Sequence, residues 1–181
     1  SYIKKGIIEG KLIPVFSGSS ASQTGIDEFI SFLFKYLPSS TEMPPVKVLQ
    51  NEQEGMLERK EDGPLAGIVV KTILDPFTGK LSYLRVFSGK LKANSQFFNS
   101  TRNTKERLGQ LFRVQGKKQE PVAEAGPGKV IAVAKLSSAQ AFDTFCEPSS
   151  PVKIPVSPLP EGAVSYSIKP KVKGTEDKLG N

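Results

Sequence analysis

The stretch that decides the fold is residues 63–91, which read GPLAGIVVKTILDPFTGKLSYLRVFSGKL. Two β-rich runs, 65–74 and 81–87, flank a segment of turn-forming residues at 75–79, so the sequence predicts an antiparallel hairpin. Side chains alternate along the second run, as expected for a strand. One face includes a charge and the other is smaller and more apolar; the two sets are Leu81, Tyr83, Arg85, Phe87 and Ser82, Leu84, Val86, Ser88.

Further short runs follow this hairpin at regular intervals. We expect strands over 95–100, 107–114, 129–136 and 144–146, with residues 116–128 as an intervening turn region that contains Gly126-Pro127-Gly128. Repeated short strands with turn residues between them are typical of a small antiparallel barrel or sandwich. The sequence therefore predicts a mainly β fold with one compact unit over residues 64–147.

The chain before this unit has a different pattern. Residues 11–16 are a short apolar run typical of a buried strand, and residues 17–25 form a Ser/Gly-rich turn. Apolar residues at 26, 29, 30, 33, 34 and 37 have helical spacing, and Pro38 ends the helix. One strand and one helix do not make an α/β core, so we expect residues 1–40 to be the end of a larger α/β domain.

Two Pro-rich or polar segments flank the β unit. Residues 41–63 and 148–162 are predicted as linkers with little core of their own. Beyond them, residues 163–168 are predicted as a strand and Thr175 to Leu179 as the opening of a helix, so residues 163–181 are interpreted as the start of a further α/β domain.

Charge is concentrated in the β unit. The net charge is +7, and residues 64–146 contain 13 Lys and Arg against 5 Asp and Glu, while the segments on either side are close to balanced. Such a surface attracts anionic partners such as nucleic acid, although basic surfaces also serve solubility alone.

Several classes of function lack the residues that they need. The chain has no histidine and one cysteine, Cys146, so a zinc site, a His-based triad and an internal disulfide are not expected. Cys146 is interpreted as an inert buried thiol. No segment approaches the roughly 20 apolar residues of a membrane span, and the first residues lack a signal peptide's apolar run. We expect a cytoplasmic protein without a membrane contact.

Two stretches resemble the elongation factor G family of translation GTPases. The segment 63–91 is similar to the opening of the family's second domain, and Lys105-Glu106-Arg107-Leu108-Gly109, Gly116-Lys117-Lys118, Glu124-Ala125-Gly126 and Asp143-Thr144 follow in the family's order. Residues 14–20, 25–27 and 36–39 are similar to the end of its GTP-binding domain. The resemblance covers essentially the whole chain and implies a translation-factor β-barrel, domain II, between a GTP-binding domain and a third domain.

The resemblance also implies a nucleotide. In the family a Gly-Ser-Ala motif helps to hold guanine, and it falls here on Ser19, Ser20 and Ala21, with Ser20 replacing the usual alanine. No G-x-x-x-x-G-K-[S/T] phosphate loop occurs in the chain, so nothing cradles the β- and γ-phosphates or supplies a hydroxyl to magnesium. We expect GTP and Mg²⁺ to belong to the parent protein, and no catalytic residue, bound cofactor or metal in this chain.

The partner implied by the resemblance is the ribosome, with small-subunit rRNA facing the barrel. The candidate rRNA-facing residues are Lys80, Arg85, Arg102, Lys105, Arg107, Lys117 and Lys118. We expect a monomer that couples the GTP-binding domain to the ribosome. A stand-alone RNA- or protein-binding barrel remains an alternative, as does part of a paralogous ribosomal protection or release-factor GTPase. Departures such as Phe142, where a glycine usually precedes Asp-Thr, leave the choice of paralogue open.

Overall fold

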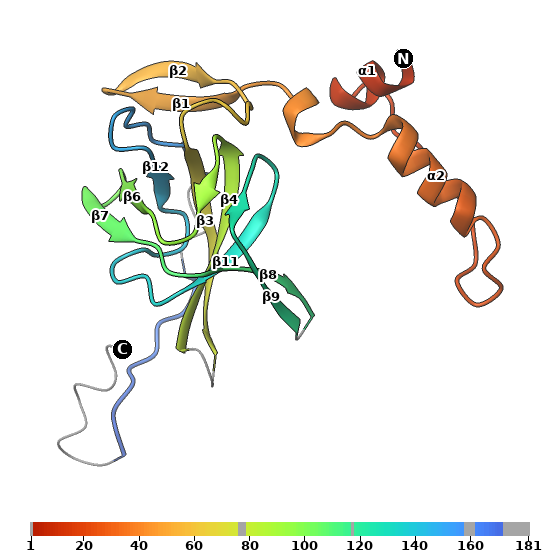
Figure 1. Ribbon diagram of the computed structural model, residues 1–181. Helices are drawn as coiled ribbons and strands as arrows, with labels where there is room; N and C mark the ends of the chain where they lie inside the picture. The colour runs from red at the N-terminus through yellow and green to blue at the C-terminus, as the bar shows by residue number, and fades with distance from the viewer. Residues whose placement is uncertain (1, 76–78, 117, 158–161, 172–181) are drawn as a thin grey trace.

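The computed structural model describes residues 2–75, 79–116, 118–157 and 162–171. Its largest unit is an eight-stranded antiparallel sheet in the order β7-β6-β12-β3-β4-β11-β8-β9, and Figure 1 shows it curving round on itself. The strands are β3 (Ala66–Asp75), β4 (Gly79–Ser88), β6 (Gln96–Asn99), β7 (Thr104–Arg107), β8 (Leu111–Gln115), β9 (Lys118–Val122), β11 (Val130–Ala134) and β12 (Thr144–Cys146). The predicted mainly β, antiparallel fold is confirmed.

A two-stranded ladder links the ends of this sheet. β5 (Leu91–Lys92) precedes β6 near one edge, and β10 (Glu124–Ala125) directly follows β9 at the other. The two pair antiparallel, Leu91 with Ala125 and Lys92 with Glu124. Closing the sheet in this way protects backbone groups that an open edge would expose. The result is a barrel around one core.

The core confirms the predicted alternation along β4. Leu84 and Val86 are fully buried among Val69, Phe97 and Phe145, whereas Arg85 between them is exposed. Phe97 and Phe145 lie 5.4 Å apart between ring centroids in a tilted arrangement, a geometry that aromatic pairs favour.

One glycine lets this core form. A Cβ on Gly67 would lie 2.2 Å from Phe145 Cζ and 2.2 Å from the Arg85 carbonyl oxygen. The register of β3 against β4 shifts beside Gly67 and again between Val69 and Lys71. Such irregularities bend and twist a strand, which suits β3 to a curved sheet.

The two predicted linker segments contribute more to a core than expected, and their assignment as linkers stays a prediction. Residues 41–63 contain a hairpin of β1 (Val46–Gln50) and β2 (Gln53–Leu57), and Lys153 from the second segment pairs with β1. Leu49 and Lys153 exchange two backbone hydrogen bonds, of 2.7 and 2.8 Å. A second core explains why these segments are ordered, because it buries apolar side chains from both of them against the barrel: Val48, Leu57, Ala66, Cys146, Val152 and Ile154.

The N-terminal segment is only partly as predicted. α1 (Tyr2–Ile8) and α2 (Ile26–Tyr36) are helices, and a short 3-10 helix, η1 (Ser40–Glu42), follows; Figure 1 shows α1 and α2 standing apart from the barrel. The predicted strand over 11–16 is absent, since no described strand pairs with it and a strand is stabilised by its neighbours' hydrogen bonds. Ile13, Val15 and Phe34 are more than four-fifths exposed.

The predicted strand over 163–168 is also wrong. These residues are exposed and form no strand, and no described segment pairs with them. The predicted start of a helix at 175–179 lies outside the described residues, as does the candidate Lys117. The assignment of residues 163–181 to a further domain therefore stays a prediction.

Candidate nucleic-acid interface

Two of the candidate cations share one exposed face of strand β7. Lys105 and Arg107 are exposed and flank Glu106, which is 1% exposed. Because side chains alternate along a strand, the inward position of Glu106 turns both cations outward. β7 is an end strand of the eight-stranded sheet. This pair is the part of the predicted RNA surface that the fold does bring together.

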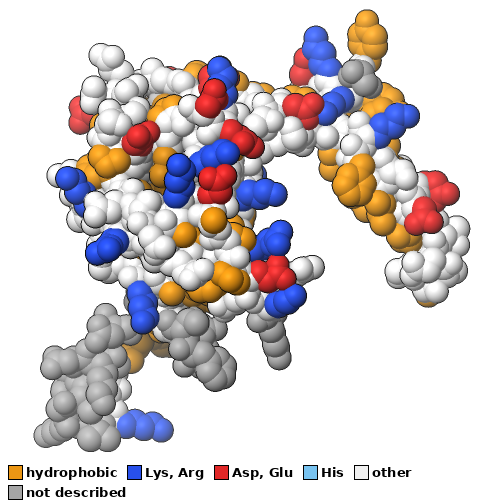
Figure 2. Space-filling view, viewed as in Figure 1, with side chains coloured by type: hydrophobic (Ala, Val, Ile, Leu, Met, Phe, Trp, Pro, Cys, Tyr) orange, Lys and Arg blue, Asp and Glu red, His pale blue; other side chains and the backbone are white. Residues whose placement is uncertain are grey.

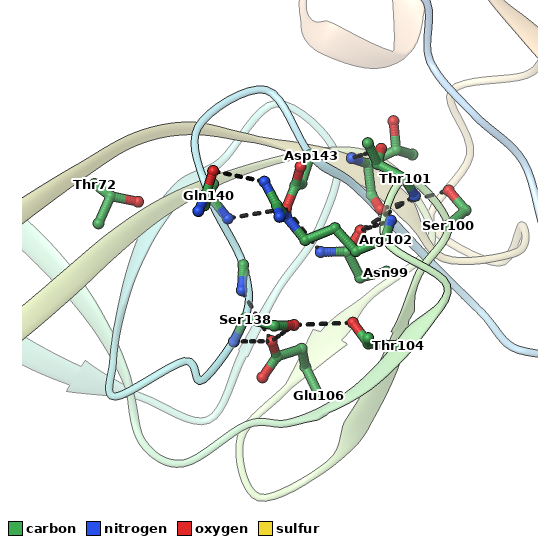
Figure 3. A network of polar contacts seen from close by, with 12 residues as sticks. Thr72, Asn99, Ser100, Thr101, Arg102, Thr104, Glu106, Ser138, Gln140 and Asp143 are labelled. Atoms are coloured by element: carbon green, nitrogen blue, oxygen red, sulfur yellow. Dashed lines mark hydrogen bonds and ion pairs between the residues drawn. The ribbon is translucent and has the colours of Figure 1, made fainter. Parts of the chain in front are cut away.

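Glu106 is held by the loop that precedes β12 (Figure 3). Its Oε1 accepts hydrogen bonds from Ser138 N, Ser138 Oγ and Ala139 N at 2.6–2.9 Å, and its Oε2 accepts two from Ser137. Burial raises the pKa of the Glu106 carboxyl, but the hydrogen bonds from Ser138 and Ser137 lower it by more, so the pKa lies below its ordinary value. The charged carboxylate fixes β7 and hence the two outward cations.

Arg102 is engaged within the protein. Its Nε donates to Asp143 Oδ2 at 2.6 Å and its Nη2 to Gln140 Oε1 at 2.6 Å. Asp143 is 3% exposed, and its Oδ2 also accepts from Asn99 Nδ2 and Gln140 N, both at 2.9 Å. Figure 3 shows these side chains converging between the β6–β7 turn and the segment before β12. Arg102 therefore neutralises a buried carboxylate and ties two loops together.

The other described candidates are dispersed. Lys80 and Arg85 both lie on β4, but five residues apart they fall on opposite faces of the strand. Lys118 lies on β9, at the other end of the sheet from β7, and its Nζ is 2.7 Å from Glu120 Oε1. Figure 2 likewise shows Lys and Arg spread over the visible barrel surface, several beside acidic side chains. The described candidates do not form one compact site.

Sequence reasoning missed Arg59, which lies beside Arg85. The guanidinium carbons of Arg59 and Arg85 are 5.0 and 5.5 Å from the ring centroid of Phe87. Arg59 follows β2 in the segment predicted as a linker, and no local pattern predicts a contact across 26 residues. The unexpected β1–β2 hairpin brings Arg59 to Phe87 and Arg85.

The predicted guanine-binding loop is a compact exposed turn. Ser19 N donates to Thr24 O at 3.0 Å, and Ser22 N donates to Ser19 Oγ at 3.3 Å. Ser19, Ser20 and Ala21 are all exposed. A Cβ on Gly18 would lie 2.8 Å from Thr24 O, so glycine allows the turn to close. The loop is closed by hydrogen bonds and exposed to solvent, and its contact with guanine stays a prediction.

Residues 64–148 match the family model described as Elongation factor G domain 2. The match spans the barrel from just before β3 to just after β12. The barrel is an elongation factor G domain 2. Both the recognition of the family and the barrel fold are thereby confirmed.

A solved structure extends the similarity beyond domain 2. A crystal structure of a protein from Thermus thermophilus aligns with a TM-score of 0.73 and 27% sequence identity, over 98% of this chain. The alignment covers 24% of that protein, so this chain spans about a quarter of the length of the structure that it matches. The similarity therefore includes the segments on both sides of domain 2.

Within the described ranges, no three His, Cys, Asp or Glu side chains are grouped so that they could hold a metal ion. None of the helices there is both long enough and apolar enough to pass through a bilayer.

Proposed function

We propose that this chain is part of a ribosomal translocation GTPase in which domain 2 contacts small-subunit rRNA. The observation that carries the proposal is the identity of the barrel, joined to its charge: residues 64–146 hold 13 basic against 5 acidic residues. Cations on a rigid barrel supply phosphate contacts, whereas selectivity comes from the shape of folded RNA. The partner would be the ribosome.

Residues 1–40 have a separate role in this proposal. They are the end of a GTP-binding domain, with Ser19, Ser20 and Ala21 beside the guanine base. The exposed apolar side chains of the 11–16 segment and α2 support this role, because an apolar surface of this kind is normally covered by further structure. GTP and Mg²⁺ would be bound mainly by other parts of that domain.

Coupling between the two parts would be mechanical. GTP binding and hydrolysis would change the angle between the nucleotide domain and domain 2, and domain 2 would transmit the change to rRNA. Domain 2 suits this task because its strands form a closed barrel whose loops are pinned by Glu106 and Asp143.

Binding of the 181-residue chain to small-subunit rRNA tests the proposal. We expect weak binding whose affinity falls steeply between low and high salt, since each phosphate contact releases counterions. The variant Lys105→Gln/Arg107→Gln should weaken binding, whereas Lys5→Gln/Lys11→Gln, two cations paired with Glu9 outside domain 2, should not. Absence of binding at low salt, or affinity that does not change with salt, would refute the proposed contact.

A further inference from the structure

Arg59, Phe87 and Arg85 form a cluster that domain 2 does not neutralise. The ion pairs among the described residues all involve other cations, namely Lys4, Lys5, Lys11, Lys90, Arg102, Arg113 and Lys118. Neither guanidinium of the cluster has an acidic partner among the described residues. Burial, and then the charge of Arg85, lower the pKa of Arg59 from its ordinary value. Two like charges are therefore held together at a cost in stability.

The backbone of the sheet and a carbonyl oxygen hold the two arginines of the cluster in place. Arg85 lies on β4, which pairs with β3 on one side and β11 on the other, so its backbone is fixed within the sheet. Arg59 donates from Nε to Pro44 O at 2.8 Å, which anchors one edge of its guanidinium. Phe87 is half-buried against the second core and presents its ring to both arginines. Attraction between cation and ring orients the two guanidinium groups.

The surroundings of Arg85 favour an anion from outside. The residues in register beside it are Ile68 on β3 and Val130 on β11, and neither carries a charge. Ile68 is 8% exposed and Val130 is 47% exposed, so Arg85 is open to solvent on its β11 side. Paired, pre-oriented guanidinium groups match the oxygens of a phosphate group, to which they donate several hydrogen bonds at once.

We propose that Arg59 and Arg85, positioned by Phe87, hold one backbone phosphate of RNA between them. The inference rests on the proposed rRNA contact and gives that contact a defined point on β4, distinct from the β7 cations. RNA is the expected source of the phosphate because the same domain carries the excess of basic residues. A carboxylate-rich protein is the competing occupant that the experiment must separate from it.

A double-mutant cycle on the intact chain tests the proposal with a small-subunit rRNA fragment as the probe. Arg59→Gln and Arg85→Gln should each weaken binding about tenfold, the usual loss for a charged hydrogen bond. The double variant should lose less than the product of the two single losses, because both groups hold one phosphate. Arg113→Gln removes the same charge from an exposed pair with Glu120 and should have little effect.

Further variants separate geometry from charge. Arg85→Lys keeps the charge and should preserve the salt slope while weakening binding, since lysine lacks the planar fork. Phe87→Leu keeps apolar packing and should weaken binding through the loss of orientation. Single variants that bind as tightly as the unmodified chain, losses that multiply, or competition by polyglutamate as strong as by RNA would each overturn the phosphate site. If the unmodified chain binds rRNA and the variants bind it equally well, the proposed function stands and only the phosphate site is refuted. If the unmodified chain does not bind rRNA, both the proposed function and the phosphate site are refuted.

Discussion

Removing the carboxylate of Glu106 is expected to destabilise domain 2 substantially. In Glu106→Ala the five donors of Ser137, Ser138 and Ala139 lose their acceptor. Ser137 is exposed and can turn to water, and Ser138 Oγ keeps Thr104 Oγ1 at 2.9 Å. Ala139 N is buried, so its unpaired N–H and the weakened Ser138 N–H together lower the free energy of unfolding by about 3 kcal/mol.

Glu106→Gln provides the matched control. Its amide oxygen can keep the three bonds that Oε1 accepts, while the NH₂ group faces only the two donors of the exposed Ser137. The loss of unfolding free energy should therefore be smaller, about 1–2 kcal/mol. The two variants separate the loss of buried acceptors from the loss of charge.

The dependence on pH follows from the direction of the pKa shift. The pKa of Glu106 in the folded protein lies below its ordinary value of 4.5, so the unfolded state binds the proton more readily. The stabilisation is fully present above that ordinary value and is lost as the pH falls through the folded pKa. The difference in stability between the unmodified chain and Glu106→Gln should shrink over the same range.

Urea unfolding followed by circular dichroism measures the loss of unfolding free energy in Glu106→Ala and in Glu106→Gln. Repeating it at several pH values gives the pH dependence of stability. A cost below about 1 kcal/mol for Glu106→Ala at neutral pH, the scale of a single ordinary hydrogen bond, would refute this role of the carboxylate. A difference between the unmodified chain and Glu106→Gln that does not change with pH would refute it as well.

Four further outcomes are expected. Gly67→Ala should lower unfolding free energy by about 2 kcal/mol through overpacking against Phe145, whereas Gly109→Ala, with open space around its Cβ position, should be nearly neutral in the same urea assay. Arg102→Gln should lower the free energy of unfolding by about 2 kcal/mol, because it leaves Asp143 without its cation, and should leave rRNA affinity at low salt nearly unchanged. A large loss of affinity with unchanged stability would instead show that Arg102 contacts RNA. Cys146, fully buried and with its pKa raised by burial, should react with iodoacetamide only after unfolding in urea, and rapid labelling of the folded chain would contradict its burial. The purified chain should not hydrolyse GTP, and phosphate release above a buffer blank would overturn that expectation.

The barrel could be predicted from the sequence because its signals are local. The alternation along 81–88 places Leu84 and Val86 in the core, and strong turn residues separate most strands. β9 was missed because its sequence, KQEPV, is polar and contains Pro121. A proline is tolerated there since β9 is an end strand of the sheet.

The β1–β2 hairpin was missed for a different reason. Its turn is Asn51-Glu52, and both residues have a positive φ, of 49° and 66°. Such turns normally carry glycine at one position, so the hairpin signal in the sequence is weak. Val48 of β1 and Leu57 of β2 are buried in one core with Val152 and Ile154, about a hundred residues later, which no local pattern reveals.

The candidate site was less predictable than the fold. Charge composition identified the basic segment, and strand alternation exposes Lys105 and Arg107. Which cations are already neutralised depends on contacts between distant residues, such as Arg102 with Asp143 and Lys90 with Glu61 and Glu124. The same is true of Arg59 and Arg85, which become neighbours only in the folded chain.

The pairing of Leu49 with Lys153 has a consequence for tension along the chain. The segments that enter and leave domain 2 are joined by two backbone hydrogen bonds and by the shared burial of Val48 and Ile154. A force that pulls residue 46 away from residue 154 therefore acts first on these two hydrogen bonds and on the core that Val48 and Ile154 share. It reaches the barrel strands only after these interactions have broken. Domain 2 can in this way keep its shape, and the spacing of its surface cations, while the chain on either side is strained.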